Sequence, residues 1–177
     1  QCIQQPPIHE GALINLGVLY EDVGRYDDAI DCFKKVLKGR PNHPRARLFL
    51  RDAEASKSEA EVANTLRFSG GVVQYDESQP DKPAVSVSLS GRLATDDKLV
   101  YLKAFRKLHT LDLTNSMVTD KGMRALKDLE TLRSLNLQSV ASISDEGLSA
   151  LKDIKNLQVL LLAGNQVTDT GMKAVKQ

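Results

Sequence analysis

Residues able to carry out chemistry are few in this sequence, and their spacing does not assemble a reactive site. The histidines are His9, His43 and His109, and the cysteines are Cys2 and Cys32. These positions match neither the Cys and His spacings of zinc sites nor the H-E-x-x-H pattern of metalloproteases. The sequence also lacks a glycine-rich phosphate loop and a G-x-S-x-G turn. We therefore expect a protein that is not an enzyme, with no catalytic residues, metal or cofactor.

The charge of the chain is nearly balanced, with 24 basic and 23 acidic residues and a net charge of +1. A nucleic-acid-binding surface would concentrate Lys and Arg, so we expect no nucleic-acid partner. No apolar run approaches the roughly 20 residues that a membrane helix needs, and the two cysteines form no disulfide framework. These observations favour a cytoplasmic protein without a membrane segment.

Two internal repeats organise the chain, and the first has a period of 34 residues. Three residues return after one period: Pro7, His9 and Ala12 recur as Pro41, His43 and Ala46. Between residues 10 and 41 the apolar residues follow helical spacing twice, on either side of Gly24, so we expect two helices there. A fixed period of this size indicates stacked units whose apolar faces are buried by their neighbours.

The residues that set this spacing are Leu13, Leu16, Gly17, Tyr20, Ala29, Phe33 and Pro41, and together they resemble the tetratricopeptide repeat. The resemblance implies a packed helix pair that presents a surface to another protein. Because the next unit loses the pattern, we expect residues 44–56 to form a capping helix and the helical domain to cover residues 1–57. Residues 1–7 fit the end of an earlier repeat, and we expect the natural chain to have more repeats upstream.

The second repeat has a period near 24 residues and fills the C-terminal half. Its leucines recur in register: Leu108, Leu111 and Leu113 return as Leu132, Leu135 and Leu137, then as Leu157, Leu160 and Leu162. Apolar and polar residues alternate around these leucines, which predicts one strand per unit with its leucines inward. A Thr-Asp or Ser-Asp pair follows each strand, and its oxygen atoms are suited to capping a short helix.

Units beginning at residues 84, 108, 132 and 157 resemble the leucine-rich repeat, in a bacterial-type form whose helix starts with V-T-D-x-G-M or a variant of it. The resemblance implies parallel strands and helices stacked as a horseshoe fragment. We expect this domain to cover residues 58–177, with residues 58–83 as a cap whose strand pairs with the first repeat. Because residues 51–61 are rich in charge and poor in apolar residues, we expect a break at residues 56–58, after which residues 58–61 begin the cap's own helix. The family's asparagine ladder survives only as Asn165, so we expect no stabilisation from it. The predicted fold is an α-helical repeat followed by an α/β solenoid.

Candidate binding residues lie on the outward side of the predicted strands. They are Ser88, Thr110, Asp112, Ser134, Asn136, Gln138, Val159 and Leu161. Short polar residues give way to an apolar patch toward the C-terminus, which suits a protein or an extended peptide segment better than a small metabolite. The alternative site is the groove of the helical domain at Ile14, Val18 and Glu21. Tetratricopeptide domains that bind a terminal carboxylate use Lys and Asn where Ile14 and Val18 stand, so here we expect an apolar or packing role.

Three functions fit this organisation. The first is a non-catalytic protein–protein interaction scaffold that presents two repeat surfaces. The second is a substrate-recruiting or regulatory arm of a larger enzyme, such as a kinase or a ubiquitin ligase, because families with leucine-rich repeats often use them so. The third is a transcription-associated module, because residues 43–56 resemble tetratricopeptide segments found ahead of domains like the C-terminal domain of bacterial RNA-polymerase alpha.

Overall fold

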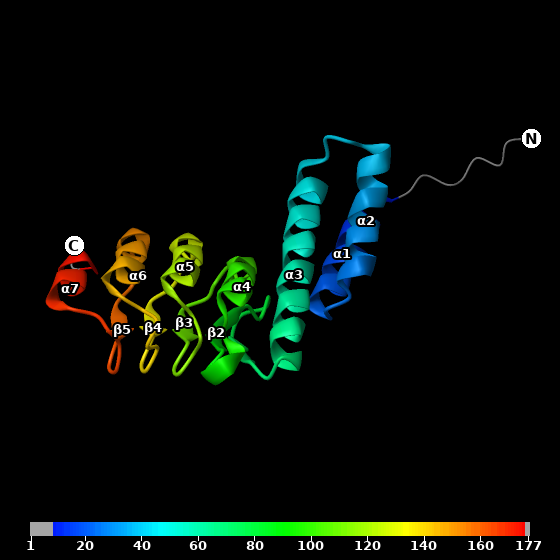
Figure 1. Ribbon diagram of the computed structural model, residues 1–177. Coiled ribbons are helices and arrows are strands. Elements are labelled where there is room, and N and C mark those ends of the chain that lie inside the picture. Colours follow the sequence, from blue (N-terminus) through cyan, green and yellow to red (C-terminus); the bar gives the residue numbers. More distant parts are fainter. Residues whose placement is uncertain (1–8, 176–177) are drawn as a thin grey trace, which may run out of the picture. The chain divides into compact units, whose positions relative to one another are not determined.

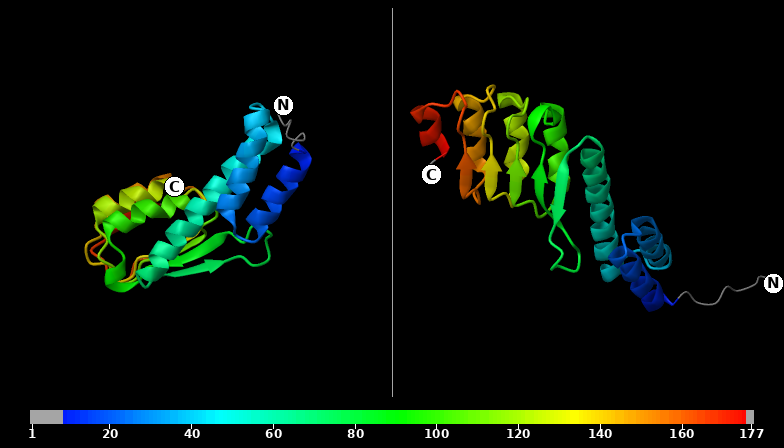
Figure 2. Two further views of the ribbon diagram at one scale, coloured as in Figure 1. Left: turned by 90° about the vertical axis from the view of Figure 1, so that its right-hand side faces the viewer. Right: turned by 90° about the horizontal axis from the view of Figure 1, so that it is seen from below.

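The computed structural model describes residues 9–175, apart from the side chains of Leu93 and Ala174. The expected end of an earlier repeat at residues 1–7 lies outside the described residues, as does Cys2. Contacts divide the chain into two compact units, Gln1–Ala60 and Glu61–Gln177. Figure 1 and Figure 2 show the helices of the first unit in blue to cyan and the repeats of the second in green to red.

Helices α1 (Glu10–Asp22) and α2 (Tyr26–Gly39) form the predicted helix pair, and Gly24 turns the chain between them at a φ of 76°. The start of α3 (Pro44–Phe68) completes the unit. One cluster joins Ile14, Val36 and Ala46, and another joins Ala29, Phe33 and Ala53. A Cβ atom on Gly17 would lie 2.5 Å from the Phe33 ring, so only glycine lets the ring fill this space.

The break expected at residues 56–58 is wrong, because α3 runs through it without interruption. Residues 51–61 read Arg-Asp-Ala-Glu-Ala-Ser-Lys-Ser-Glu-Ala-Glu and contain neither Pro nor Gly. Alanine, glutamate and lysine favour helix, so a charged, apolar-poor segment continues the helix instead of ending it. The contact boundary falls after Ala60, inside α3. No helix ends at residue 57, so the domain boundary predicted there remains a prediction.

Five strands form one sheet in the second unit, in the order β1-β2-β3-β4-β5. Their bounds are Val72–Tyr75, Ala84–Ser88, Thr110–Asp112, Ser134–Asn136 and Val159–Leu161. Strand β1 pairs antiparallel with β2, and β2 to β5 are parallel. Leu111, Leu135 and Leu160 align across three strands. The predicted hairpin and the predicted strand register are both confirmed.

Short helices follow the strands and cover one face of the sheet (Figure 1). The α-helical turns are α4 (Asp96–Leu99), α5 (Asp120–Met123), α6 (Asp145–Ser149) and α7 (Asp169–Val175). The 3-10 turns are η1 (Gly91–Leu93), η2 (Val100–Ala104), η3 (Arg124–Asp128) and η4 (Ala150–Asp153). Leucines of the strands and helices interlock in one core, which Ala63 and Leu66 of α3 join.

An aspartate ladder connects successive helix starts. Asp96 accepts hydrogen bonds from the amide (2.8 Å) and hydroxyl (2.7 Å) of Thr119, Asp120 from those of Ser144 (2.9 and 2.5 Å), and Asp145 from those of Thr168 (2.8 and 2.6 Å). Each of these hydroxyls also accepts a bond from an amide of its own helix, at 3.2 Å. The hydroxyls cap their own helices as predicted, but the aspartates bind the next unit.

Glycine in the helix motif makes room for this ladder. A Cβ on Gly122, Gly147 or Gly171 would lie 2.8, 3.0 or 2.8 Å from the Cγ of the aspartate one unit earlier. Within the described residues the repeat that begins at residue 84 has no aspartate rung before it, and it has Lys98 at the glycine position. The ladder therefore explains a sequence motif that helix capping alone does not require. Asn165 contributes a single further rung by accepting from the Val140 amide at 2.9 Å.

The Gly17 contact predicts opposite effects for two glycines of α1. Gly17→Ala should destabilise the first unit by about 1–3 kcal/mol, because the buried Phe33 ring cannot move away without disturbing the core. Gly11→Ala, which meets no atom within 4 Å, should stabilise it by up to about 1 kcal/mol through helix propensity. Hydrogen-exchange protection of α1 and α2 measures both changes, and equal effects of the two substitutions would contradict this packing.

The ladder predicts that Asp120→Ala costs about 1–3 kcal/mol, because it leaves the Ser144 amide without its acceptor. Gly147→Ala should destabilise the same contact by displacing Asp120. Asp128→Ala is the matched control: this exposed aspartate at the end of η3 should change stability by less than about 0.5 kcal/mol. Urea unfolding measures all three, and a similar loss for Asp120→Ala and Asp128→Ala would rule out the ladder.

Acid should weaken the ladder. Hydrogen bonds from the Thr168 hydroxyl and amide lower the pKa of Asp145; burial opposes them, and a bond from the Gly171 amide adds a smaller lowering. A lowered folded-state pKa adds stability above the unfolded value of 3.8, and this stability disappears as the pH falls through the folded value. Urea unfolding at about one-unit intervals between pH 5 and pH 2 should therefore show that Asp145→Asn loses less stability with falling pH than the unaltered protein does. Parallel curves would show that Asp145 is not part of this titration.

Candidate functional site

Two rows of side chains cross the outward side of the sheet, and we call them together the strand face. The first row is Val72, Ser88, Asp112, Asn136 and Leu161, and the second is Gln74, Ser86, Thr110, Ser134 and Val159. Every step in each row is a paired position on neighbouring strands, so these side chains lie on one face. The strand leucines between them point into the core.

Asp112 is the one charged residue in these two rows, and it stands at the centre of the first. Its Oδ1 atom accepts the Thr114 amide (3.0 Å) and hydroxyl (2.6 Å), and its Oδ2 atom accepts the Ser88 hydroxyl (3.1 Å). Burial disfavours the charge, but the Thr114 and Ser88 bonds outweigh it and lower the pKa of Asp112. The half-buried carboxylate therefore stays ionised at neutral pH.

Asn136 repeats part of this arrangement one strand along. Its Oδ1 atom accepts the Gln138 amide at 3.0 Å, as Asp112 accepts the Thr114 amide. In both units the strand therefore ends in a turn that a side chain of the face holds in place. Gln138 lies just beyond the last residue of β4, and its side chain is half-buried. Some of the hydrogen-bonding groups of the strand face are thus already bonded within the protein.

Apolar side chains are exposed at both ends of the strand face. Val159 and Leu161 of β5 are 46% and 42% exposed, and Val72 of β1 is 54% exposed. The apolar patch expected at the C-terminal end is present. The patch at Val72 was missed by the sequence analysis, although the alternation of Val72, Val73 and Gln74 before a hairpin was a usable signal. Seven of the eight strand candidates therefore lie in the two rows, whereas Gln138 follows β4. Ser86 of β2 and Val72 and Gln74 of β1 complete the face.

The candidates in the helical unit do not form a comparable site. Ile14 is 3% exposed and packs against Val36 and Ala46, which agrees with a packing role. Its place among the binding candidates is wrong, because a buried core residue cannot meet a partner. Val18 packs partly buried on the second cluster, and Glu21 accepts the Ser56 hydroxyl at 3.3 Å. The exposed apolar side chains of α1 are Leu16, Leu19 and, just after the helix, Val23.

The other residues whose side chains could react or bind a metal have structural roles or stand alone. His43 Nδ1 accepts the Ala46 amide at 3.2 Å and so caps α3, as suits a turn residue. Cys32 is a buried free thiol. Among residues 9–175 no group of three or more His, Cys, Asp or Glu side chains could hold a metal ion.

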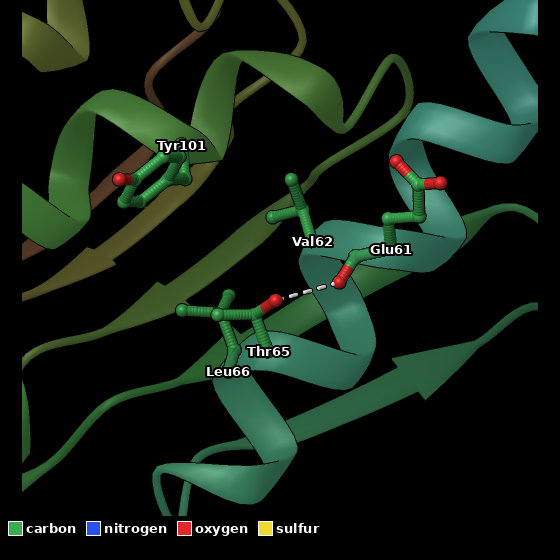
Figure 3. A pocket seen from close by; sticks show the side chains of 5 residues that line it. All are labelled: Glu61, Val62, Thr65, Leu66 and Tyr101. Atoms are coloured by element: carbon green, nitrogen blue, oxygen red, sulfur yellow. Dashed lines mark hydrogen bonds between the residues drawn. The ribbon is translucent and has the colours of Figure 1, made fainter.

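A hollow of about 290 Å³ lies in the second unit between the end of α3 and η2 (Figure 3). Its walls are Glu61, Val62, Thr65, Leu66 and Tyr101. The Thr65 hydroxyl donates to the Glu61 carbonyl at 2.9 Å, so that hydroxyl is satisfied within the helix. This pocket has mainly aliphatic and aromatic walls and no arrangement of groups suited to a reaction.

No helix in the described part of the chain is both long and apolar enough to cross a membrane.

Comparisons with known families agree with the two periods of the chain. The family model of the tetratricopeptide repeat matches residues 11–43. The family model of the leucine-rich repeat matches residues 106–127, 129–152 and 154–176. No curated protein matches the sequence. The unit that begins at residue 84 lies outside the matches, but its strand and its Asp96 rung follow the geometry of the others. Both families are typical of protein interaction and are generally non-catalytic, and this chain has one tetratricopeptide repeat followed by leucine-rich repeats.

Proposed function

We propose that this protein is a non-catalytic interaction scaffold and that the strand face is its main binding surface. The observation that supports this most directly is the continuity of the face. Five paired strands present two uninterrupted rows, with exposed aliphatic residues at both ends and short polar residues between them. Exposed apolar residues grouped on one surface are typical of contact sites.

The composition of the face favours a protein segment as the partner. Its hydroxyl, amide and carboxylate groups are short and are held partly by internal hydrogen bonds, so they cost little entropy to order on binding. The face is a broad surface formed by paired strands, and a polypeptide can contact several strands at once. These properties fit an extended protein segment better than a small metabolite.

The second surface of the scaffold is the outward side of α1. Leu16 and Leu19 are 39% and 61% exposed, and their spacing of three residues places them on one side of the helix. Val23, just after the helix, is 68% exposed. Such a stripe suits the apolar side of a partner helix, because side chains spaced in this way form ridges that pack into helical grooves. We expect this surface, and not Ile14, to be the contact of the helical unit.

A matched pair of double variants tests the proposal. Val72→Arg with Leu161→Arg places two large cations at the ends of the strand face, and both positions are exposed, so the fold should remain. Val100→Arg with Met117→Arg makes the same change at two exposed apolar residues outside the two rows. Affinity capture from a cell extract, quantified by mass spectrometry, should lose its specific partners with the first pair and keep them with the second.

Circular dichroism of each variant controls for folding. Equal capture by both double variants would move the binding site away from the strand face. Leu19→Arg, on α1, then separates partners of the helical unit from partners of the sheet.

A further inference from the structure

The order of side chains in the first row identifies a class of ligand, on the assumption that the strand face is the binding surface. The row runs from an aliphatic residue through a hydroxyl, a carboxylate and an amide to a second aliphatic residue: Val72, Ser88, Asp112, Asn136 and Leu161. We infer that it binds an extended segment of another protein with a Lys or Arg midway between two aliphatic residues, each three positions away.

The spacing follows from the geometry of the sheet. Neighbouring strands lie about 4.8 Å apart, so Val72 and Leu161 each lie two strands, or about 9.6 Å, from Asp112. A polyproline II segment repeats its side-chain direction every three residues, with a rise of about 9.3 Å per turn. Residues three apart in such a segment would therefore meet Val72, Asp112 and Leu161 in turn. In a β-strand ligand, residues three apart point to opposite sides, so they could not all meet the row.

Charge complementarity selects the central residue. Asp112 is the one charged residue among the ten of the strand face, and its partners Ser88 and Thr114 are neutral. Its Oδ1 atom already accepts two hydrogen bonds, whereas Oδ2 accepts one and has room for another donor. A cationic side chain supplies both the opposite charge and that donor.

The aliphatic positions provide the anchors. Val72 and Leu161 are about half exposed, and Val159 lies beside Leu161 in the second row of the same strand. Burying aliphatic surface is favourable in proportion to its area, so two anchors fix the ends of the segment while the cation fixes its position along the row. A polyproline II ligand is also extended before binding, which lowers the entropy that binding costs.

The peptide Leu-Pro-Pro-Arg-Pro-Pro-Leu tests the inference with the full chain. It should bind the unaltered protein, and replacing its Arg with Gln should weaken binding about tenfold. With Asp112→Asn, which retains an oxygen acceptor for Thr114, the same replacement should have almost no effect. Fluorescence anisotropy of labelled peptides measures the four affinities. Equal losses from the Gln replacement in both proteins would overturn the inference.

A transposed variant provides a stricter control. Asp112→Asn combined with Asn136→Asp keeps the composition, the net charge and both turn acceptors, and moves the carboxylate by one strand. Its affinity for the central-Arg peptide should fall about tenfold, because the carboxylate then lies about 4.8 Å from the position that the Arg side chain reaches. An unchanged preference for the central Arg would show that the cation does not bind the Asp112 carboxylate.

A peptide library selected on the unaltered protein, and counter-selected on Val72→Arg with Leu161→Arg, separates the two proposals. Enriched peptides with a cation flanked by aliphatic residues three places away support both. Enriched peptides that need the face but lack this pattern overturn the ligand class and leave the surface standing. If no enriched peptide depends on the face, the proposed binding surface is wrong as well.

Discussion

An aspartate at the start of α4, α5 and α6 binds the hydroxyl and amide of the next repeat, and the stacking of the repeats in the second unit depends on this contact. Asp96, Asp120 and Asp145 each supply both carboxylate oxygens to a Thr or Ser. Because the partner hydroxyl also caps its own helix, one carboxylate fixes where the next helix begins. The strands before these helices are then aligned at equivalent positions, and the rows of the strand face follow from that alignment.

This contact also explains why the turns can differ without disturbing the stack. Each strand from β2 to β5 is followed by a residue with a positive φ, at Gly91, Asn115, Ser139 and Gly164, although only two of the four are glycine. The third unit has one residue more than the others between Leu137 and Ser144. Ser144 still reaches Asp120, at 2.9 Å through its amide, so the extra residue is absorbed within the turn. The register of β4 and β5 is preserved.

The sequence predicted the features that recur in every repeat, but it did not reveal those that depend on contacts between repeats. The alternating leucines determine the strand register, because a shift of one residue would expose every leucine. The Asp of the Thr-Asp pair sits at the start of its own helix, so its bond to the following unit could not be separated from capping without coordinates. The uninterrupted α3 was missed because charge was taken as a sign of a break, whereas helix ends depend on Pro, Gly and caps. Ile14 was placed in a groove by analogy, but helix packing buries it.

The strand face illustrates the same division. Its residues on β2 to β5 followed from alternation, since side chains two apart share a side. The contribution of β1 depended on the direction and register of a hairpin, which place Val72 beside Ser88. That pairing changes the face from a polar surface with one apolar end to a polar centre between two apolar ends. Recognition of an extended segment at three spaced points becomes possible only with this second end.

The most direct test of this account is a chemical-shift map of the isotopically labelled protein titrated with Leu-Pro-Pro-Arg-Pro-Pro-Leu. The Thr114 and Gln138 amides donate to Asp112 and Asn136, so they report on the centre of the row. We predict saturable shifts of these two amides together with those of Val72 and Leu161, and little change in α5 and α6. Shifts confined to the helices, or to α1, with the Thr114 and Gln138 amides unmoved, would contradict binding at the strand face.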